Sequence, residues 1–354
     1  MGVYYAGQGS RSYWRERLYD KMHSLQKAED KVLRDINKAY NRAFNEINRE
    51  LNDFFVQYAS DNHITLQQAQ QRLTPIEDRE YRQRIEQLKR AYEATRDENI
   101  LSEIAQLSSR KEVTRFQALL DSISAKLIEV SDNVQITLDD YLNGAYTRGY
   151  NDSLENMQIN KTVINHRSVE EVIRYPYAGA MFSDRIWRNK RQLLNWINDD
   201  LTKGIIRGDS IQKMGKSLRQ RCHVAKYQAE RLVRTESCYA YTQGSLHGYE
   251  DSKLVNAVEI MIAGDQRTCP GCMDNDGVVV PLNEARAGDT IPPFHPFCRC
   301  CIAPLVIEKS KIWQTSSLTS CFLIVFLLDS DVKENSDNNT VTKTLTRRNK
   351  QWKM

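Results

Sequence analysis

Several features that mark common enzyme classes are missing from this sequence of 354 residues. It contains no glycine-rich phosphate loop, no Ser-His-Asp arrangement and no paired acidic motif. These absences remove the usual sequence evidence for nucleotide-dependent enzymes, serine hydrolases and two-carboxylate catalysts. We therefore expect no catalytic residues and a protein that is not an enzyme.

Long apolar runs and a strong charge imbalance are also lacking. The longest apolar run, Cys321 to Leu328, is far below the ~20 residues that a membrane-spanning helix requires. The N-terminus shows no basic region followed by an apolar run, so we predict no secretory signal. A net charge of +4 neither requires nor excludes nucleic acid. These features indicate a reducing, aqueous compartment and no membrane partner.

Glycine and proline are absent from residues 12–58, where apolar residues recur every three or four positions. This pattern predicts one long amphipathic helix, because nothing in the stretch would end it. Thr65 begins a capping-box pattern that predicts a short helix ending near Pro75. Further helices are predicted over residues 79–105 and 112–130, and residues 141–150, with two glycines, are expected to close this half. The first 165 residues are thus predicted to form a long helical bundle or hairpin.

The chain changes character from about residue 166. Helices are predicted from Ser183, over residues 210–218 and over residues 225–249, followed by a strand over residues 257–263 and a turn into a short strand at 275–281. The predicted fold is mainly α, with a small α+β, zinc-knuckle-like C-terminal domain over residues 166–308. Residues 309–354 end in a Lys/Asn/Thr-rich stretch and are predicted to be a disordered tail.

Five of the eight cysteines and one of the six histidines lie between residues 265 and 301. A Cys-x-x-Cys pair places two thiolates on one tight turn, the usual first half of a tetrahedral zinc site. Thiolate and imidazole suit zinc, and a loop-rich segment with little core of its own gains stability from a bound metal. The sequence predicts a structural zinc site with more candidate ligands than four positions need: Cys269, Cys272, His295, Cys298 and Cys300.

Other interpretations of these cysteines stay open. Disulfide pairing conflicts with their odd number and the absence of a secretion signal. A redox Cys-x-x-Cys motif is expected at a helix N-terminus within a βαβ unit, and unliganded thiols would simply be small buried residues. Catalytic zinc would also need an open coordination position and a general base. Asp265 and Asp274 are close in sequence, but the pattern turns neither toward a metal.

Polar residues within a mostly apolar helix form a second notable motif, Arg234-Thr-Glu236. Such residues usually form a buried ion pair or cap a neighbouring loop. Four further motifs accompany this one in the chain: Phe182-Ser-x-Arg-Ile-Trp187, Asp265-x-Arg267-Thr-Cys-x-x-Cys272, Asp276-Gly277 and Pro292-Pro-x-His-Pro-x-Cys-Arg-Cys300.

In this order the motifs resemble the minor head proteins of tailed bacteriophages, the Mu F-like head-morphogenesis family, over about residues 180–305. The opening Ser12-Tyr-Trp-Arg-Glu-Arg17 and the long helices fit the Gram-positive phage branch. The family's motif residues fall on Arg234, Glu236, Asp265 and Arg267, together with the cysteines and the histidine of the cluster. The sequence departs from the family after Pro304.

The resemblance implies a minor capsid protein that acts at the portal during procapsid assembly and DNA packaging or delivery. It implies the phage portal protein as a partner, with scaffold, major capsid protein and double-stranded DNA as further candidates. The implied location is the virion, at the head interior or portal vertex, after assembly in the host bacterial cytoplasm. Two other functions stay open: a DNA-binding accessory of the virion, and a zinc-dependent hydrolase or nuclease that uses His295 and Asp265.

Overall fold

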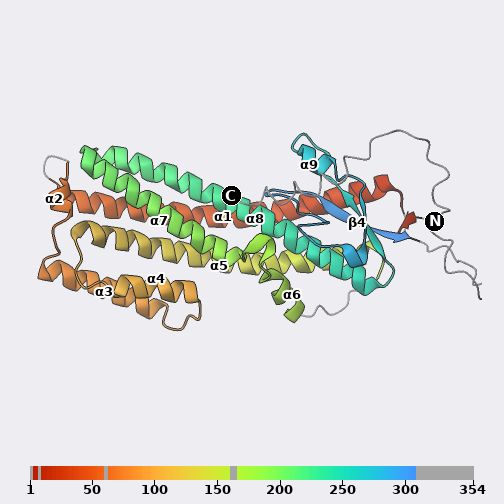
Figure 1. The fold of residues 1–354 in the computed structure, drawn as a ribbon, viewed down its shortest axis with the longest axis horizontal. Helices are drawn as coiled ribbons and strands as arrows, with labels where there is room; N and C mark the ends of the chain where they lie inside the picture. Colours follow the sequence, from red (N-terminus) through yellow and green to blue (C-terminus); the bar gives the residue numbers. More distant parts are fainter. Residues whose placement is uncertain (1–2, 7–8, 60–62, 160–165, 308–354) are drawn as a thin grey trace, which may run out of the picture.

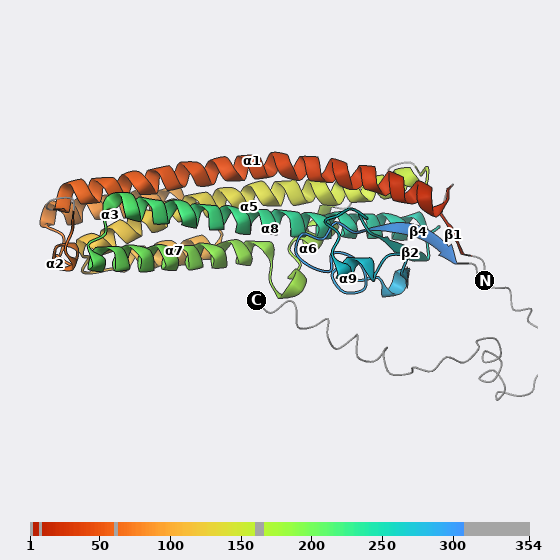
Figure 2. The ribbon, with the colours of Figure 1, turned by 90° about the horizontal axis from the view of Figure 1, so that it is seen from above.

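A computed structural model describes residues 3–6, 9–59, 63–159 and 166–307. Four long helices lie along the long axis of the molecule, and a small sheet packs at one end of them (Figures 1 and 2). These helices are α1 (Arg11–Tyr58), α5 (Arg115–Asn156), α7 (Phe182–Arg207) and α8 (Ile211–Ser252). The prediction of a mainly helical protein with a small strand-containing C-terminal part is confirmed.

The first long helix forms as its apolar periodicity predicts. Its N-cap is Ser10, whose hydroxyl accepts a hydrogen bond from the backbone N–H of Tyr13. Its buried stripe includes Trp14, Leu25 and Ile47, which are at most 1% exposed. Thr65 forms the expected capping box at the start of α2 (Leu66–Ala69).

The single helix predicted over residues 79–105 is wrong, because two helices occupy this region. They are α3 (Pro75–Ala91) and α4 (Glu98–Ser108). The carboxylate of Asp97 accepts hydrogen bonds from the backbone N–H groups of Asn99 and Ile100, and this N-cap starts a new helix. The resulting hairpin buries its apolar side chains against Trp187 on α7.

Two predicted helix ends are also wrong. The helix predicted over residues 112–130 does not end there but continues through residues 141–150 as α5, and residues 210–218 and 225–249 belong to the single helix α8. Gly149 of α5 and Gly244 of α8 allow these two helices to pack closely against each other. A Cβ atom at Gly149 would lie 2.1 Å from the carbonyl oxygen of Tyr241, and one at Gly244 would lie 2.1 Å from that of Tyr146.

The sheet joins the two ends of the described chain. Its strand order is β1-β4-β2-β3, with every neighbouring pair antiparallel. The strands are β1 (Val3–Tyr5), β2 (Ala257–Met261), β3 (Val279–Pro281) and β4 (Cys301–Ile307). Strands β2 and β3 match the predicted strands, whereas β1 and β4 are additions. The shorter elements are α6 (His166–Ile173), α9 (Pro270–Met273), and the 3-10 turns at Tyr177–Gly179 and Leu282–Glu284.

One hydrophobic core runs through the bundle and into the sheet. It contains Leu51 of α1, Leu138 of α5 and Leu218 of α8, and continues through Val258 and Ile302 of the sheet. Side chains from both sides of residue 165 therefore share this core, and the predicted division at that residue stays a prediction. In the described part of the chain, no helix has the length and apolarity needed to cross a membrane. The predicted tail and its apolar run lie outside the described residues.

Candidate metal centre

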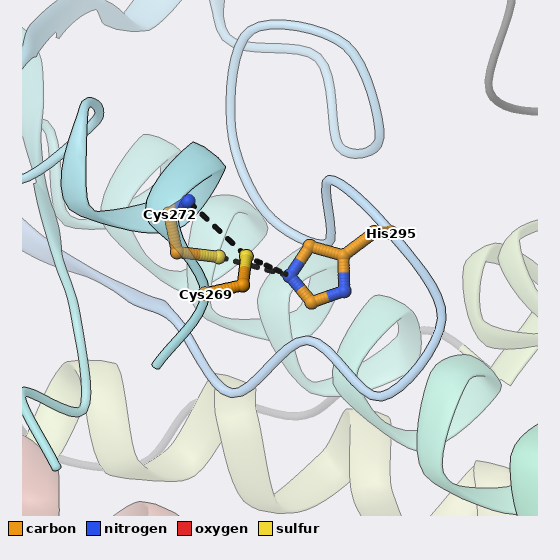
Figure 3. Close-up of side chains that lie close together, drawn as sticks. All are labelled: Cys269, Cys272 and His295. Carbon is orange, nitrogen blue, oxygen red and sulfur yellow. Dashed lines mark hydrogen bonds between the residues drawn. The ribbon is translucent and has the colours of Figure 1, made fainter. Parts of the chain in front are cut away.

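The first half of the predicted metal site is a tight turn that leads out of the sheet. Cys269 is the N-cap of α9, and its sulfur accepts a hydrogen bond from the backbone N–H of Cys272 at 3.4 Å. Pro270 occupies the first helical position, where a missing N–H costs nothing. This geometry turns both sulfurs to the same side of the loop, toward the imidazole of His295 (Figure 3).

The distances within this group suit a shared metal ion. His295 Nε2 lies 3.3 Å from the sulfur of Cys269 and 3.0 Å from that of Cys272. Tetrahedral zinc, with Zn–S of about 2.3 Å and Zn–N of about 2.0 Å, separates its ligand atoms by about 3.5 to 3.8 Å. His295 Nδ1 lies 2.7 Å from the carbonyl oxygen of Pro296, to which it donates, so Nε2 is the ring nitrogen that faces the sulfurs.

A second group of donors adjoins the first. Its ligand atoms, which belong to Cys272, Cys298 and Cys300, all lie within 4.8 Å of one another. The same limit holds for the ligand atoms of the first group, Cys269, Cys272 and His295. Cys272 belongs to both groups, and its sulfur lies 4.0 Å from that of Cys298. The structure thus brings together all five predicted ligands in two overlapping sets. Their chemistry fits zinc, because the first set offers two sulfurs and one nitrogen and the second offers three sulfurs, and zinc accepts both kinds of donor.

The thiols of the cluster differ in how readily they lose a proton: contacts with neighbouring sulfurs raise the pKa of Cys272 and Cys300 and lower that of Cys298. Hydrogen bonds from Cys238, Cys272 and Cys300 hold the pKa of the Cys298 thiol well below its usual range. The sulfurs of Cys272 and Cys298 raise the pKa of His295 to about 11. Because thiolate is the form that binds a metal, Cys298 is the buried thiol of the cluster that is best prepared for ligation.

Cys238 is a member of this cluster that the sequence analysis missed. It lies on α8, packs with Cys272, Cys298 and Cys300, and its thiol donates to the carbonyl oxygen of Cys300 at 3.7 Å. The sequence offered one signal for this residue, because Cys238 lies two residues after Glu236 of the Arg-Thr-Glu motif. Cys301 does not join the cluster: its thiol donates to the carbonyl oxygen of Met261 within the core.

The segment that carries the five candidate ligands, residues 265–300, is called the metal loop. Asp265 pairs with Arg299 across this loop instead of facing a metal. Its carboxylate accepts two hydrogen bonds from the guanidinium of Arg299, both at 2.6 Å. Arg299 holds the pKa of Asp265 well below its usual range. Asp265 also accepts a hydrogen bond from the backbone N–H of Arg267, whose side chain is exposed. Asp274 is exposed at the end of α9.

Residues 195–303 match the family described as phage Mu protein F like protein. This region belongs to the phage Mu F-like family. The match contains the five predicted metal ligands together with Arg234, Glu236, Asp265 and Arg267. It confirms the resemblance seen in the order of the motifs, and the family is one of phage head proteins.

The chain is also similar to the NAD(+)--arginine ADP-ribosyltransferase EFV of Enterococcus faecalis. The two are 25% identical over 158 residues, which cover 43% of this chain and 32% of that protein. The chain therefore matches about a third of that relative's length, and the named activity is that of the relative. No solved structure matches the chain.

Within the Mu F-like region, Arg234 and Glu236 have different partners. Arg234 pairs with Glu29 at 2.7 Å and Asp30 at 2.6 Å, both on α1. Glu236 pairs with Arg185 of α7. The Arg-Thr-Glu pattern predicts an ion pair or a loop cap here, and the motif provides both.

Thr235, between these two residues, contacts the second half of the metal loop. Its hydroxyl oxygen accepts a hydrogen bond from the backbone N–H of Phe297 at 3.3 Å. Phe297 lies between His295 and Cys298 and has a positive φ of 63°. The Arg-Thr-Glu motif therefore connects α1, α7 and the metal loop to one turn of α8.

Proposed function

We propose that this chain is a minor head protein that acts at the portal vertex during procapsid assembly and DNA packaging or delivery. The family match over residues 195–303 is the observation that carries the proposal. In this role the long helical bundle supplies the surface that binds the portal protein. The metal-bound Mu F-like region gives one end of that bundle a fixed shape.

We propose that the metal is zinc and that it is structural. Four of the predicted ligands are cysteines and the fifth is a histidine, so the cluster can fill a tetrahedral site without leaving a position open. The ligands come from a short α9 and loops between β2 and β4, a segment with little secondary structure. A bound metal would supply the stability that this segment cannot obtain from a core of its own.

We also propose that the protein acts without catalysis. Asp265, the carboxylate that the hydrolase alternative requires as its base, is engaged by Arg299 and has a lowered pKa, which makes it a poor general base. A zinc-dependent hydrolase would require a free base beside the metal. Metal-dependent turnover of nucleic acid or peptide that is lost in Asp265→Ala, while that variant keeps its metal, would contradict this proposal.

The decisive experiment is co-expression of the full chain with the cognate portal protein. Size-exclusion chromatography with light scattering and native mass spectrometry would give the composition of any complex. We expect a stable complex with few copies of this chain per portal ring. Co-expression with the major capsid protein alone is the matched control, because the proposal requires preference for the portal.

A folded, monodisperse protein that binds no portal under any assembly condition would overturn the proposed location. Binding to double-stranded DNA stays a separate prediction, tested by the salt dependence of the affinity for DNA.

A further inference from the structure

A basic cavity lies beside the metal loop, between α7 and α8. It has a volume of about 530 Å³ and is partly enclosed. These two helices run next to each other along the bundle (Figures 1 and 2). Its polar lining comes from three arginines, three side-chain amides and one threonine: Arg185, Arg188, Arg231, Asn189, Gln192, Gln228 and Thr235. In the described part of the chain, no aspartate or glutamate lines it.

Only one of the three arginines is neutralised. Arg185 pairs with Glu236 and donates to the carbonyl oxygen of Tyr177. Arg188 and Arg231 are exposed, and among the described residues no carboxylate forms an ion pair with either. The nearby Glu230 is paired with Arg234 instead. The cavity therefore holds two guanidinium groups that have no acidic partner within the described chain.

The wall of this cavity is continuous with the metal loop. Pro296 forms part of the lining and accepts the hydrogen bond from His295 Nδ1 through its carbonyl oxygen. Thr235, also in the lining, accepts the hydrogen bond from the N–H of Phe297. Pro296, next to the candidate ligand His295, thus forms part of the cavity wall, and Thr235 connects that wall to Phe297 of the loop. A formed metal loop and a formed cavity are parts of one structure.

We infer that this cavity binds a carboxylate-bearing segment of a partner protein. Guanidinium groups pair with carboxylates through two parallel hydrogen bonds, and the amides of Asn189, Gln192 and Gln228 can satisfy the backbone of an extended peptide. The apolar part of the lining, which includes Leu232 and Pro296, suits the aliphatic part of such a segment. This inference does not depend on the proposed role at the portal.

The shape of the cavity favours a peptide over duplex DNA. Duplex DNA presents its phosphates along a broad surface, so proteins bind it with extended, outward-facing basic surfaces. Here the guanidinium groups of Arg188 and Arg231 line a partly enclosed cavity, which a single acidic side chain and its neighbours can enter. A peptide therefore uses the cavity as it is, whereas a duplex would meet only its rim.

The test uses the full chain and a fluorescein-labelled peptide of alternating glutamate and serine as the probe. Fluorescence anisotropy measures its dissociation constant for the unmodified chain and for Arg188→Gln, Arg231→Gln and Arg219→Gln. Arg219 is the matched control, because it is an exposed arginine of α8 that does not line the cavity. The same peptide with glutamine in place of glutamate controls for charge.

We expect each cavity variant to weaken binding by about tenfold, the loss of one charge-assisted interaction. Arg219→Gln should change the affinity by less than about twofold, since screened, distant charges contribute little. Circular dichroism during heating checks that each variant is folded. Because both cavity residues are exposed, their replacement by glutamine should leave the unfolding temperature unchanged.

Three results would overturn the inference. The first is no measurable binding of the acidic peptide to the unmodified chain. The second is an equal loss of affinity in all three variants, which would show general attraction of negative charge. The third is a preference for single-stranded oligothymidylate or duplex DNA that the two cavity variants remove, which would make the cavity a nucleic-acid site.

Discussion

The guanidinium of Arg185 on α7 pairs with the carboxylate of Glu236 on α8, which is 4% exposed. Burial raises the pKa of Glu236 to about 7, and Arg185 only partly opposes this effect. The pair links the motif that begins at Phe182 to the Arg-Thr-Glu motif. It also fixes Arg185 at the wall of the basic cavity.

This pairing predicts a pH-dependent stability. Because the pKa of Glu236 is raised to about 7 from 4.5, the folded state holds its proton to higher pH than the unfolded state does. The contribution of this residue to stability is therefore full below about pH 4.5 and is lost as the pH rises to about 7. Relative to Glu236→Gln, the unmodified protein should lose about 2.5 kcal/mol of unfolding free energy between pH 5 and pH 8.

Urea denaturation of both proteins at several pH values measures this difference, and other titrating groups cancel between them. A difference that stays constant, or that grows with pH in favour of the unmodified protein, would show that Glu236 is ionised throughout the range.

Metal removal should affect one segment and spare the bundle. Cys272 belongs to both donor groups, so Cys272→Ser should abolish the bound zinc. We expect the segment around Asp276 to lose protection from hydrogen exchange while the helical circular dichroism signal is retained. Elemental analysis by mass spectrometry gives the metal content. The control is Cys222→Ser, which alters a buried thiol of α8 that lies in neither group.

Retention of a full metal equivalent in Cys272→Ser would remove this residue from the ligand set. Parallel measurements on Cys269→Ser and Cys300→Ser then decide which donors complete the site.

The contact between α5 and α8 predicts opposite effects for one substitution at two helical glycines. A Cβ at Gly244 would lie 2.1 Å from the carbonyl oxygen of Tyr146, so Gly244→Ala should destabilise the protein by about 1 to 3 kcal/mol. A Cβ at Gly144 meets nothing within 4 Å, so Gly144→Ala should stabilise it by about 0.5 to 1 kcal/mol. Thermal and urea unfolding compare the two. Equal stability of both variants would mean that the helices do not approach this closely.

The start of α1 is held to the Mu F-like region by Asp276. Its two carboxylate oxygens each lie 3.0 Å from a guanidinium, one of Arg11 and one of Arg15. Asp276→Asn should accelerate hydrogen exchange in β1 and the first turn of α1. The cost in global stability should be only about 1 kcal/mol, because both arginines are substantially exposed. Asp274→Asn, at an exposed position two residues earlier, is the control and should change neither quantity.

Local sequence patterns were enough to predict those elements that depend on residues close together in the chain. The helix over residues 12–58 follows from its apolar periodicity and from the absence of any residue that would end it. The turn at Cys269 follows from Cys-x-x-Cys, and the five candidate ligands follow from donor chemistry and spacing. The order of the motifs was enough to predict the resemblance to the Mu F-like family that residues 195–303 show.

The remaining features were decided by contacts between residues far apart in the chain. Gly149 lies in a stretch that was expected to close the helical half, and Gly244 lies within a predicted helix. Only the packing of α5 against α8 shows that both glycines allow close approach. Strand β1 is three residues long and forms because β4 lies beside it, about 300 positions later. Cys238 enters the thiol cluster because α8 passes beneath the metal loop.

The sequence by itself therefore determined the helical class, the candidate donors and the resemblance of one region to the Mu F-like family. The tertiary structure decided which helices are continuous, which charges are paired and where two arginines stay without an acidic partner among the described residues. The physical reason is that helix periodicity and turn chemistry act over a few residues, whereas burial, ion pairing and close packing depend on partners that the fold brings together.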